Sequence, residues 1–226
     1  MVALTHLPAQ QSPDETPQWV PATWADYVAA CEEAEAKQID HFRVYFNQRY
    51  LYVDMGWEGI SHSKCRELLT MIFFAWFVGR QPDTLFEALG GCIIEKPEQR
   101  GGSPDEVLYL GANSPQWKPG ESRRINLRQW SIPNLVCEVG DTTLASDLDE
   151  KKAIYAALEV PEYWVIDVQG LRVIAFLLQA DGRYQQCEVS QVLSGLEISL
   201  VEKTFARLAT GTNGSAAQWF AQQIAS

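Results

Sequence analysis

The feature that most constrains the fold is a carboxylate inside a strand that otherwise reads as buried. The segment Pro133–Val139 (PNLVCEV) is apolar except for Asn134 and Glu138. A buried charge is costly unless it is paired, so Glu138 needs a partner within the protein. Two partners fit this position: a neighbouring Arg or Lys, forming a salt bridge, or a hard cation such as Mg²⁺ or Mn²⁺.

The next predicted helix carries a lysine where a core residue is expected. The apolar face of this helix, predicted over about Asp147–Glu159, repeats at about 100° per residue. The face consists of Leu148, Ile154, Tyr155 and Leu158. Lys151 falls near its centre and Lys152 at its edge, while Asp147 lies one turn before Lys151. Either the Lys151 ammonium reaches Glu138, or its side chain extends past the core to water.

A second acidic residue opens an earlier strand. In the segment Ser103–Leu110 (SPDEVLYL), Asp105 comes directly before an apolar run. Asp105 by itself reads equally well as a turn residue and as a ligand. An Asp, a Glu and a Lys together suit phosphodiester hydrolysis, because carboxylates hold a metal ion that activates water. The lysine would orient that water or stabilise the transition state.

The remaining pattern predicts an α/β fold with a mixed sheet flanked by helices. We expect a flexible N-terminal arm over residues 1–20 and a single domain over 21–226. The predicted helices are Trp24–Lys37, a helix capped by Ser61 or Ser63 that runs to about Gly79, Asp83–Ala88, Asp147–Glu159 and Ala216–Ile224. The predicted strands are a hairpin over His41–Asp54, then Cys92–Glu95, Glu106–Leu110, Leu135–Val139 and Tyr163–Asp167, and a hairpin of Arg172–Gln179 and Tyr184–Val189.

Charge weighs against strong nonspecific affinity for DNA. The net charge is −11 and the pI is about 4.7, whereas phosphate contacts need Lys and Arg. One loop is nevertheless basic, and it either contacts phosphates or balances the acidic surface. Its cationic residues are Lys118, Arg123, Arg124 and Arg128.

Other function classes lack their sequence signals. No apolar run reaches the roughly 18–20 residues that cross a bilayer, and the N-terminus does not resemble a signal peptide, so we expect a cytoplasmic protein. The five cysteines form no Cys-x-x-Cys pair, and neither a zinc site nor a disulfide framework is predicted. A nucleophile elbow, a P-loop and a histidine pair are also missing, which weighs against a small-molecule hydrolase.

The motifs resemble those of the Uma-two family, a bacterial family of the PD-(D/E)XK nuclease superfamily. The matching elements are the Ser-Pro-Asp strand, Glu-Val, Asp-Thr-Thr, Asp-x-x-x-Lys-x-x-x-Tyr and Glu-Tyr-Trp-Val-x-Asp. The resemblance covers about residues 40–176, is strongest over 133–168, and leaves the C-terminal hairpin and helix (172–226) outside this catalytic core. It implies a restriction-endonuclease-like fold and an endonuclease that cuts DNA with Mg²⁺ or Mn²⁺.

Residue by residue, the resemblance implies catalytic roles for Asp105, Glu138 and Lys151, with the two acids as metal ligands. The superfamily signature expects a lysine two residues after the Glu, where this chain has Gly140. Lys151 on the following helix takes that part in the family. An Asp that is frequent in the second strand of family members is replaced here by Asn134.

The resemblance also implies auxiliary residues. Either Glu58 or Glu67 is an auxiliary acid that completes the site. Asp147 and Tyr155 orient it, and His62 is interpreted as a cap or surface residue. Trp164 is interpreted as a core residue.

Two questions stay open at this point. The superfamily often dimerises, and the aromatic hairpin could form a homodimer interface or an ordinary core strand pair. The alternative function is a nuclease fold that has lost catalysis and serves as a binding or scaffold protein, which the acidic pI and Asn134 favour.

Overall fold

The computed structural model describes residues 18–39 and 41–225. The predicted arm over residues 1–20 therefore lies largely outside the described residues. Its described end is part of the fold, because Val20–Pro21 forms strand β1 and Val20 pairs with Leu51. No helix among the described residues is long and apolar enough to cross a membrane.

One of two sheets, sheet A, is built around the predicted hairpin. Its strands are β1, β2 (Arg43–Asn47), β3 (Tyr50–Asp54), β5 (Ile94–Lys96), β6 (Arg100–Gly102) and β8 (Ile125–Asn126), in the order β1-β3-β2-β6-β5-β8. Helix α1 (Trp24–Ala36) covers one face, where Val44 and Phe46 pack against Tyr27. The hairpin is confirmed, and both of its strands are interior strands of the sheet.

The second sheet, sheet B, contains the acidic strands. Its members are β4 (Phe86–Gly90), β7 (Glu106–Leu110), β9 (Leu135–Gly140), β10 (Glu162–Asp167), β11 (Arg172–Leu178) and β12 (Tyr184–Cys187), in the order β12-β11-β10-β9-β7-β4. Strands β9 and β10 are parallel. Parallel neighbours need a crossover, which α3 (Leu144–Leu148) and α4 (Glu150–Ala157) provide.

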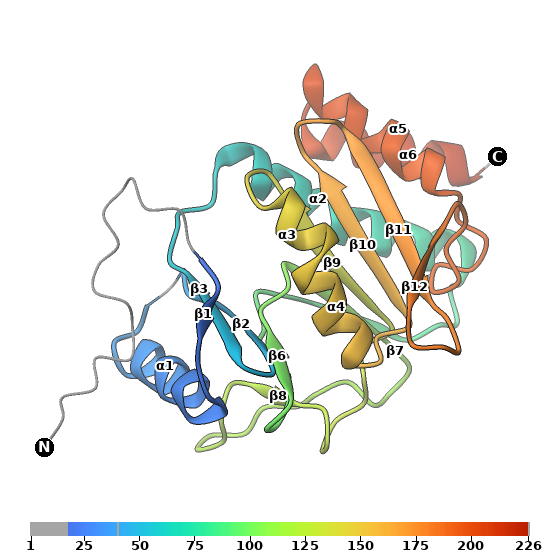
Figure 1. Cartoon of the computed structure of the whole chain (residues 1–226). Coiled ribbons are helices and arrows are strands. Elements are labelled where there is room, and N and C mark those ends of the chain that lie inside the picture. The colour runs from blue at the N-terminus through green and yellow to red at the C-terminus, as the bar shows by residue number, and fades with distance from the viewer. Residues whose placement is uncertain (1–17, 40, 226) are drawn as a thin grey trace, which may run out of the picture.

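Helices cover both faces of sheet B, in agreement with the predicted architecture (Figure 1). On one face lie α2 (Ile60–Arg80), α5 (Ile198–Ala206), the short 3-10 helix Arg207–Ala209 and α6 (Asn213–Ala225); α3 and α4 lie on the other. Side chains of β9 alternate between them. Cys137 and Val139 join the α2 side, whereas Val136 and Glu138 face α4. This alternation aims Glu138 at the helix that carries Lys151.

Three expectations about helices need correction. Residues Asp83–Ala88 were predicted as a helix, but Phe86–Gly90 is strand β4, because it pairs antiparallel with β7 at the sheet edge. Such tertiary pairing overrides a weak local preference. Helix α2 begins after Gly59, so neither Ser61 nor Ser63 is its cap. The predicted helix Asp147–Glu159 is two helices, α3 and α4, separated at Asp149, whose φ of −123° and ψ of −86° interrupt the helix.

The chain passes from sheet A to sheet B through the Ser-Pro-Asp segment. Strand β6 ends at Gly102 and β7 begins at Glu106, so Ser103, Pro104 and Asp105 span the junction. The Ser103 hydroxyl accepts a hydrogen bond from the Val44 backbone N–H at 3.0 Å, and the Ser103 carbonyl accepts one from the Tyr45 hydroxyl at 2.7 Å. These bonds to the hairpin fix Asp105 where the two sheets meet.

Candidate active site

Asp105 is a buried carboxylate with fixed contacts on both oxygens. It is 2% exposed, and its Oδ2 accepts a hydrogen bond of 2.7 Å from the backbone N–H of Val139, the residue after Glu138. Its Oδ1 lies 2.8 Å from an Arg43 guanidinium nitrogen and 3.2 Å from His62 Nε2. Burial raises the pKa of Asp105, but the contact with His62 and the charge of Arg43 outweigh burial and hold that pKa below its usual value. Asp105 is therefore an anion.

His62 belongs to this site, contrary to its interpretation as a cap or surface residue. The ring is buried, at 5% exposure, because the first turn of α2 packs against the sheet junction. Donor atoms of Glu58, His62 and Asp105 all lie within 4.8 Å of one another, and they are the only group of this kind among the described residues. Glu58 lies in the loop before α2 and His62 in its first turn, so no helical spacing links the two residues in the sequence.

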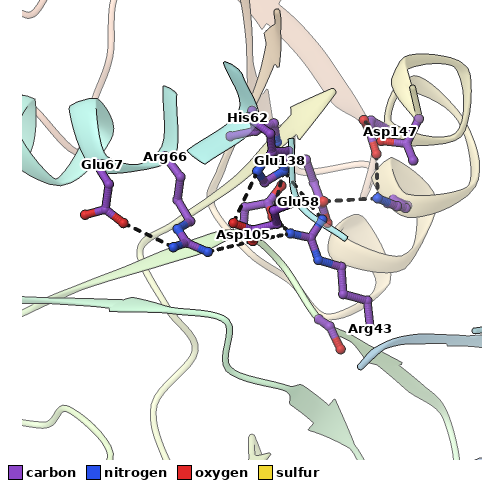
Figure 2. Close-up of polar contacts among 12 residues, drawn as sticks. Arg43, Glu58, His62, Arg66, Glu67, Asp105, Glu138 and Asp147 are labelled. Atoms are coloured by element: carbon purple, nitrogen blue, oxygen red, sulfur yellow. Dashed lines mark hydrogen bonds and ion pairs between the residues drawn. The ribbon is translucent and has the colours of Figure 1, made fainter. Parts of the chain in front are cut away.

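Two arginines hold this acid–histidine cluster together (Figure 2). Glu58 Oε1 accepts from Arg43 and from Arg66, each at 2.6 Å. Glu67, the other auxiliary candidate, accepts a hydrogen bond of 3.1 Å from Arg66 and is half exposed. Arg43 has no periodic signal in the sequence, because it comes from the start of β2 and reaches the cluster only through the fold.

Glu138 is held on the other side of the site by three donors. Its carboxylate, 1% exposed, lies 3.1 Å from Lys151 Nζ and 3.2 Å from the Tyr45 hydroxyl. The Tyr155 hydroxyl also donates to Oε1. Burial raises the pKa of Glu138, and the Lys151 ammonium acts against that shift and favours the ionised carboxylate. Tyr45 was not singled out in the sequence, because an aromatic residue in a hairpin reads as core.

Lys151 is buried rather than directed to solvent. It is 2% exposed, and its Nζ lies 2.7 Å from Asp147 Oδ1 and 4.4 Å from the centre of the Tyr45 ring. Burial lowers the pKa of Lys151, but Glu138, followed by Tyr45 and Asp147, raises it well above its usual value. Asp147 is fixed in turn by the Thr143 hydroxyl, which donates to Oδ2 at 2.8 Å. Lys151 therefore carries its positive charge between two carboxylates.

Gly140 explains why no lysine follows Glu138 in the strand. A Cβ atom at this position would lie 2.8 Å from Asp147 Oδ2 and 3.2 Å from Leu144 Cα, both closer than van der Waals contact allows. Asp147 therefore occupies the space that a side chain at position 140 would need. The ammonium reaches Glu138 from α4 instead.

Asn134 lies away from these groups. Its side-chain oxygen accepts a hydrogen bond of 2.8 Å from the Leu110 backbone N–H, so it joins β7 to the start of β9. The amide satisfies a backbone donor, and the exchange of Asp for Asn at this position does not touch the acid cluster.

The donor chemistry at Asp105 suits a divalent cation. Carboxylate oxygens are ligands for Mg²⁺ and Mn²⁺, and an imidazole nitrogen is a ligand for transition-metal ions. The His62 Nδ1 atom is buried without a hydrogen-bond partner and lies 3.8 Å from Glu58 Oε2. An unsatisfied buried nitrogen is costly, and a cation at this position would satisfy it. Glu138 is not a member of the 4.8 Å group.

The predicted basic loop does not converge on the site. Arg124 pairs with the buried Glu95 at 3.0 Å, Arg123 lies 3.6 Å from Glu35, and Arg128 donates to the Pro97 carbonyl. The backbone N–H of Lys118 bonds to Glu121 within the loop itself. These residues precede or follow β8, at the far edge of sheet A from β2.

Comparison with known proteins identifies the family. A family model described as Uma2, "Putative restriction endonuclease", matches residues 24–211. The chain is also similar to a solved structure from Anabaena variabilis, titled "Crystal structure of a putative nuclease belonging to DUF820", with 14% identity, a TM-score of 0.49, and coverage of 79% of this chain and 90% of that one. No curated protein matches the chain. Because the family model spans most of its length, the chain belongs to the Uma2 family of restriction-endonuclease-like proteins.

Proposed function

We propose that the chain is a metal-dependent endonuclease that hydrolyses phosphodiester bonds in DNA. The observation that supports this most is the buried Lys151 ammonium, 3.1 Å from Glu138, whose neighbour in the strand, Val139, donates its backbone N–H to Asp105. A buried ion pair adds little net stability compared with apolar side chains of similar size. The presence of this ion pair beside Asp105 and Asp147 therefore favours a chemical role.

In this proposal Asp105 holds an Mg²⁺ or Mn²⁺ ion together with Glu58 and His62. Glu138, the second predicted ligand, lies outside this 4.8 Å group, so its carboxylate would have to move toward Asp105 to bind the same ion. The bound ion would lower the pKa of a water molecule and offset the charge on the phosphate. Asp105 suits the role of metal ligand, because Arg43 and His62 keep its carboxyl group ionised.

Lys151 would act on the attacking water or on the developing negative charge. A preorganised cation in a dry site stabilises a transition state without reorganisation. Asp147 and the Tyr45 ring hold the ammonium in place, and Tyr45 and Tyr155 hold Glu138. We assign these three residues positioning roles.

Two observations favour the alternative, a binding or scaffold protein without catalysis. Arg43 pairs with both Asp105 and Glu58, so the negative charge of the cluster is already partly compensated by the protein itself. The net charge of −11 also weighs against tight binding of DNA.

Cleavage of supercoiled plasmid DNA in Mg²⁺, in Mn²⁺ and in EDTA separates the two functions. The wild type should cut only with a divalent ion, and Glu138→Gln and Lys151→Met should each slow cutting by about 100-fold or more. Lys152→Met, the neighbour on the same helix, is the matched control and should cut normally. If the folded wild type cuts in no divalent ion while it still binds DNA or a protein, the scaffold function replaces the enzyme.

A further inference from the structure

An unusually exposed tryptophan borders the acid–histidine cluster. Trp57 lies in the loop between β3 and α2, directly before Glu58, and is 86% exposed. Its ring centre lies 4.6 Å from that of His41, with the planes inclined by 47°. Ile60, three residues further on, is 79% exposed. The loop therefore presents apolar and aromatic surface to solvent beside residues that surround Asp105.

The position of Trp57 has no structural explanation in the core. An indole ring contributes most to stability when its large apolar area is buried, as it is for Trp164, which is fully buried. Trp57 leaves most of that area in water, while the very next residue binds Arg43 and Arg66. A side chain of this kind at the border of an active site is a candidate contact for substrate.

The cations that contact the acids of the site offer little to a polyanion. Arg43, Arg66 and Lys151 are all engaged by carboxylates, and the basic loop lies at the far edge of sheet A. With a net charge of −11, affinity for nucleic acid must come largely from contacts other than phosphate pairing. Aromatic stacking on bases is such a contact, because every base has a π-face and stacking needs no charge.

We propose that Trp57, backed by His41, stacks on an unpaired base next to the scissile phosphate. Within a duplex both faces of each base are covered by neighbouring bases, and exposing one requires unstacking. The site therefore prefers single-stranded DNA or a locally unpaired segment over a fully paired duplex. This inference rests on the proposed nuclease function and names its substrate class.

Binding measured without turnover tests the inference separately from catalysis. Fluorescence anisotropy in Ca²⁺ compares a labelled single strand, a duplex with a central unpaired bubble, and the fully paired duplex. The wild type should bind the first two more tightly. Trp57→Ala should weaken binding to unpaired DNA by about five- to one-hundredfold, whereas Trp57→Phe, which keeps a ring, should stay within about threefold of the wild type.

Phe74→Ala is the matched control, because Phe74 is 61% exposed and lies about 18 Å along α2 from His62 at 1.5 Å per residue. It should bind DNA like the wild type. The stacking contribution should also change little between low and high salt, unlike phosphate contacts.

Three binding results overturn the inference: equal affinity for paired and unpaired DNA, normal binding by Trp57→Ala, or a loss of affinity in Trp57→Phe as large as in Trp57→Ala. A fourth is a change from dimer to monomer in Trp57→Ala by light scattering, which would assign the residue to a protein interface. Binding that depends on Trp57, found without any cleavage, would contradict only the proposed catalysis. Cleavage that is equally fast in the wild type and in Trp57→Ala would contradict only the proposed stacking.

Discussion

Lys151 Nζ lies 3.1 Å from Glu138 Oε2, and the two side chains are 2% and 1% exposed. The pair joins α4 to β9. Neither charge has access to bulk water, so each depends on the other for its ionised state. This mutual dependence makes the energetic consequences of removing one partner predictable.

We expect Lys151→Met to lower the free energy of unfolding by about 3–5 kcal/mol, because it leaves Glu138 and Asp147 buried without a cation. Urea denaturation at pH 7 measures this change. Lys152→Met is the control: its ammonium lies 4.7 Å from the Phe176 ring centre, a contact worth about 1 kcal/mol or less.

The double variant Glu138→Gln/Lys151→Met separates stability from chemistry. It should recover part of the lost stability, because Asp147 is then the only one of the two acids that has lost its cation, but it should recover no cleavage. A single Lys151→Met variant as stable as the wild type would show that the pair is not buried as described.

Gly140 should tolerate no side chain. We expect Gly140→Ala to lower the free energy of unfolding by about 1–3 kcal/mol, the usual cost of overpacking, because its Cβ would lie 2.8 Å from Asp147 Oδ2. Gly214→Ala is the control, since its Cβ would lie 3.9 Å from the nearest atom, Thr212 Oγ1. Thermal or chemical denaturation measures both.

A lysine at position 140 should not replace the one on α4. Gly140→Lys in the Lys151→Met background should remain inactive in the plasmid assay, because Asp147 and Leu144 occupy the required space. Recovery of cutting in that double variant would contradict this account of why the ammonium comes from the helix.

The parts of the site that follow local periodicity could be predicted from the sequence. The spacing of the helix placed Lys151 on its buried face, and the apolar strand placed Glu138 in the core; the structure has both side chains buried and in contact. Period-2 and period-3.6 patterns report which face of an element is buried. These patterns are sufficient to predict a contact when the two residues lie on a strand and on the helix that directly follows it.

The parts that depend on long-range convergence could not be predicted. Arg43 reaches Asp105 across 62 residues of sequence, and no pattern in HFRVYF distinguishes a site arginine from a solvated one. His62 was interpreted as surface because one histidine near a helix start has no periodic signature. Strand β4 was interpreted as a helix because its pairing partner, β7, lies about 20 residues further along the chain.

His62 should govern the choice of metal. Imidazole is a ligand for transition ions, whereas Mg²⁺ prefers oxygen, so His62→Asn should weaken Mn²⁺ binding by about tenfold or more and Mg²⁺ binding by less. Isothermal titration calorimetry measures both affinities. His41→Asn, which changes an exposed ring outside the cluster, should leave them unchanged. Equal losses for the two ions would remove His62 from the ligand set.

Arg43 should oppose cation binding. Its guanidinium lies 2.8 Å from Asp105 and 2.6 Å from Glu58, so it competes for the same oxygens. We expect Arg43→Gln to tighten Mn²⁺ binding in the same titration, because it removes one positive charge from the cluster. Arg66→Gln, which frees only Glu58 and Glu67, should have the smaller effect. Weaker binding in Arg43→Gln would mean that the arginine supports the ion instead.

Asp167 of the Glu-Tyr-Trp-Val-x-Asp motif should contribute to stability in a pH-dependent way. Its carboxylate is 4% exposed and accepts from the Gly170 backbone N–H at 2.7 Å and from Arg172 at 3.0 Å. Burial raises the pKa of Asp167, but Gly170 and Arg172 outweigh burial and lower that pKa below its usual value. The unfolded chain therefore binds the proton more tightly than the folded chain. The stabilisation is complete above the unfolded pKa of about 4 and is lost as pH falls through the folded pKa.

Asp167→Asn should accordingly lower the free energy of unfolding by about 1.5–3 kcal/mol at pH 7, the usual range for hydrogen bonds to a charged group. The difference from the wild type should shrink as the pH falls below about 4, as followed by urea denaturation across pH. Asp83→Asn, an exposed acid before β4, should change stability by less than about 0.5 kcal/mol at pH 7. A gap between wild type and Asp167→Asn that persists unchanged to pH 3 would mean that the lost stability comes from packing and not from the charge, because packing does not titrate.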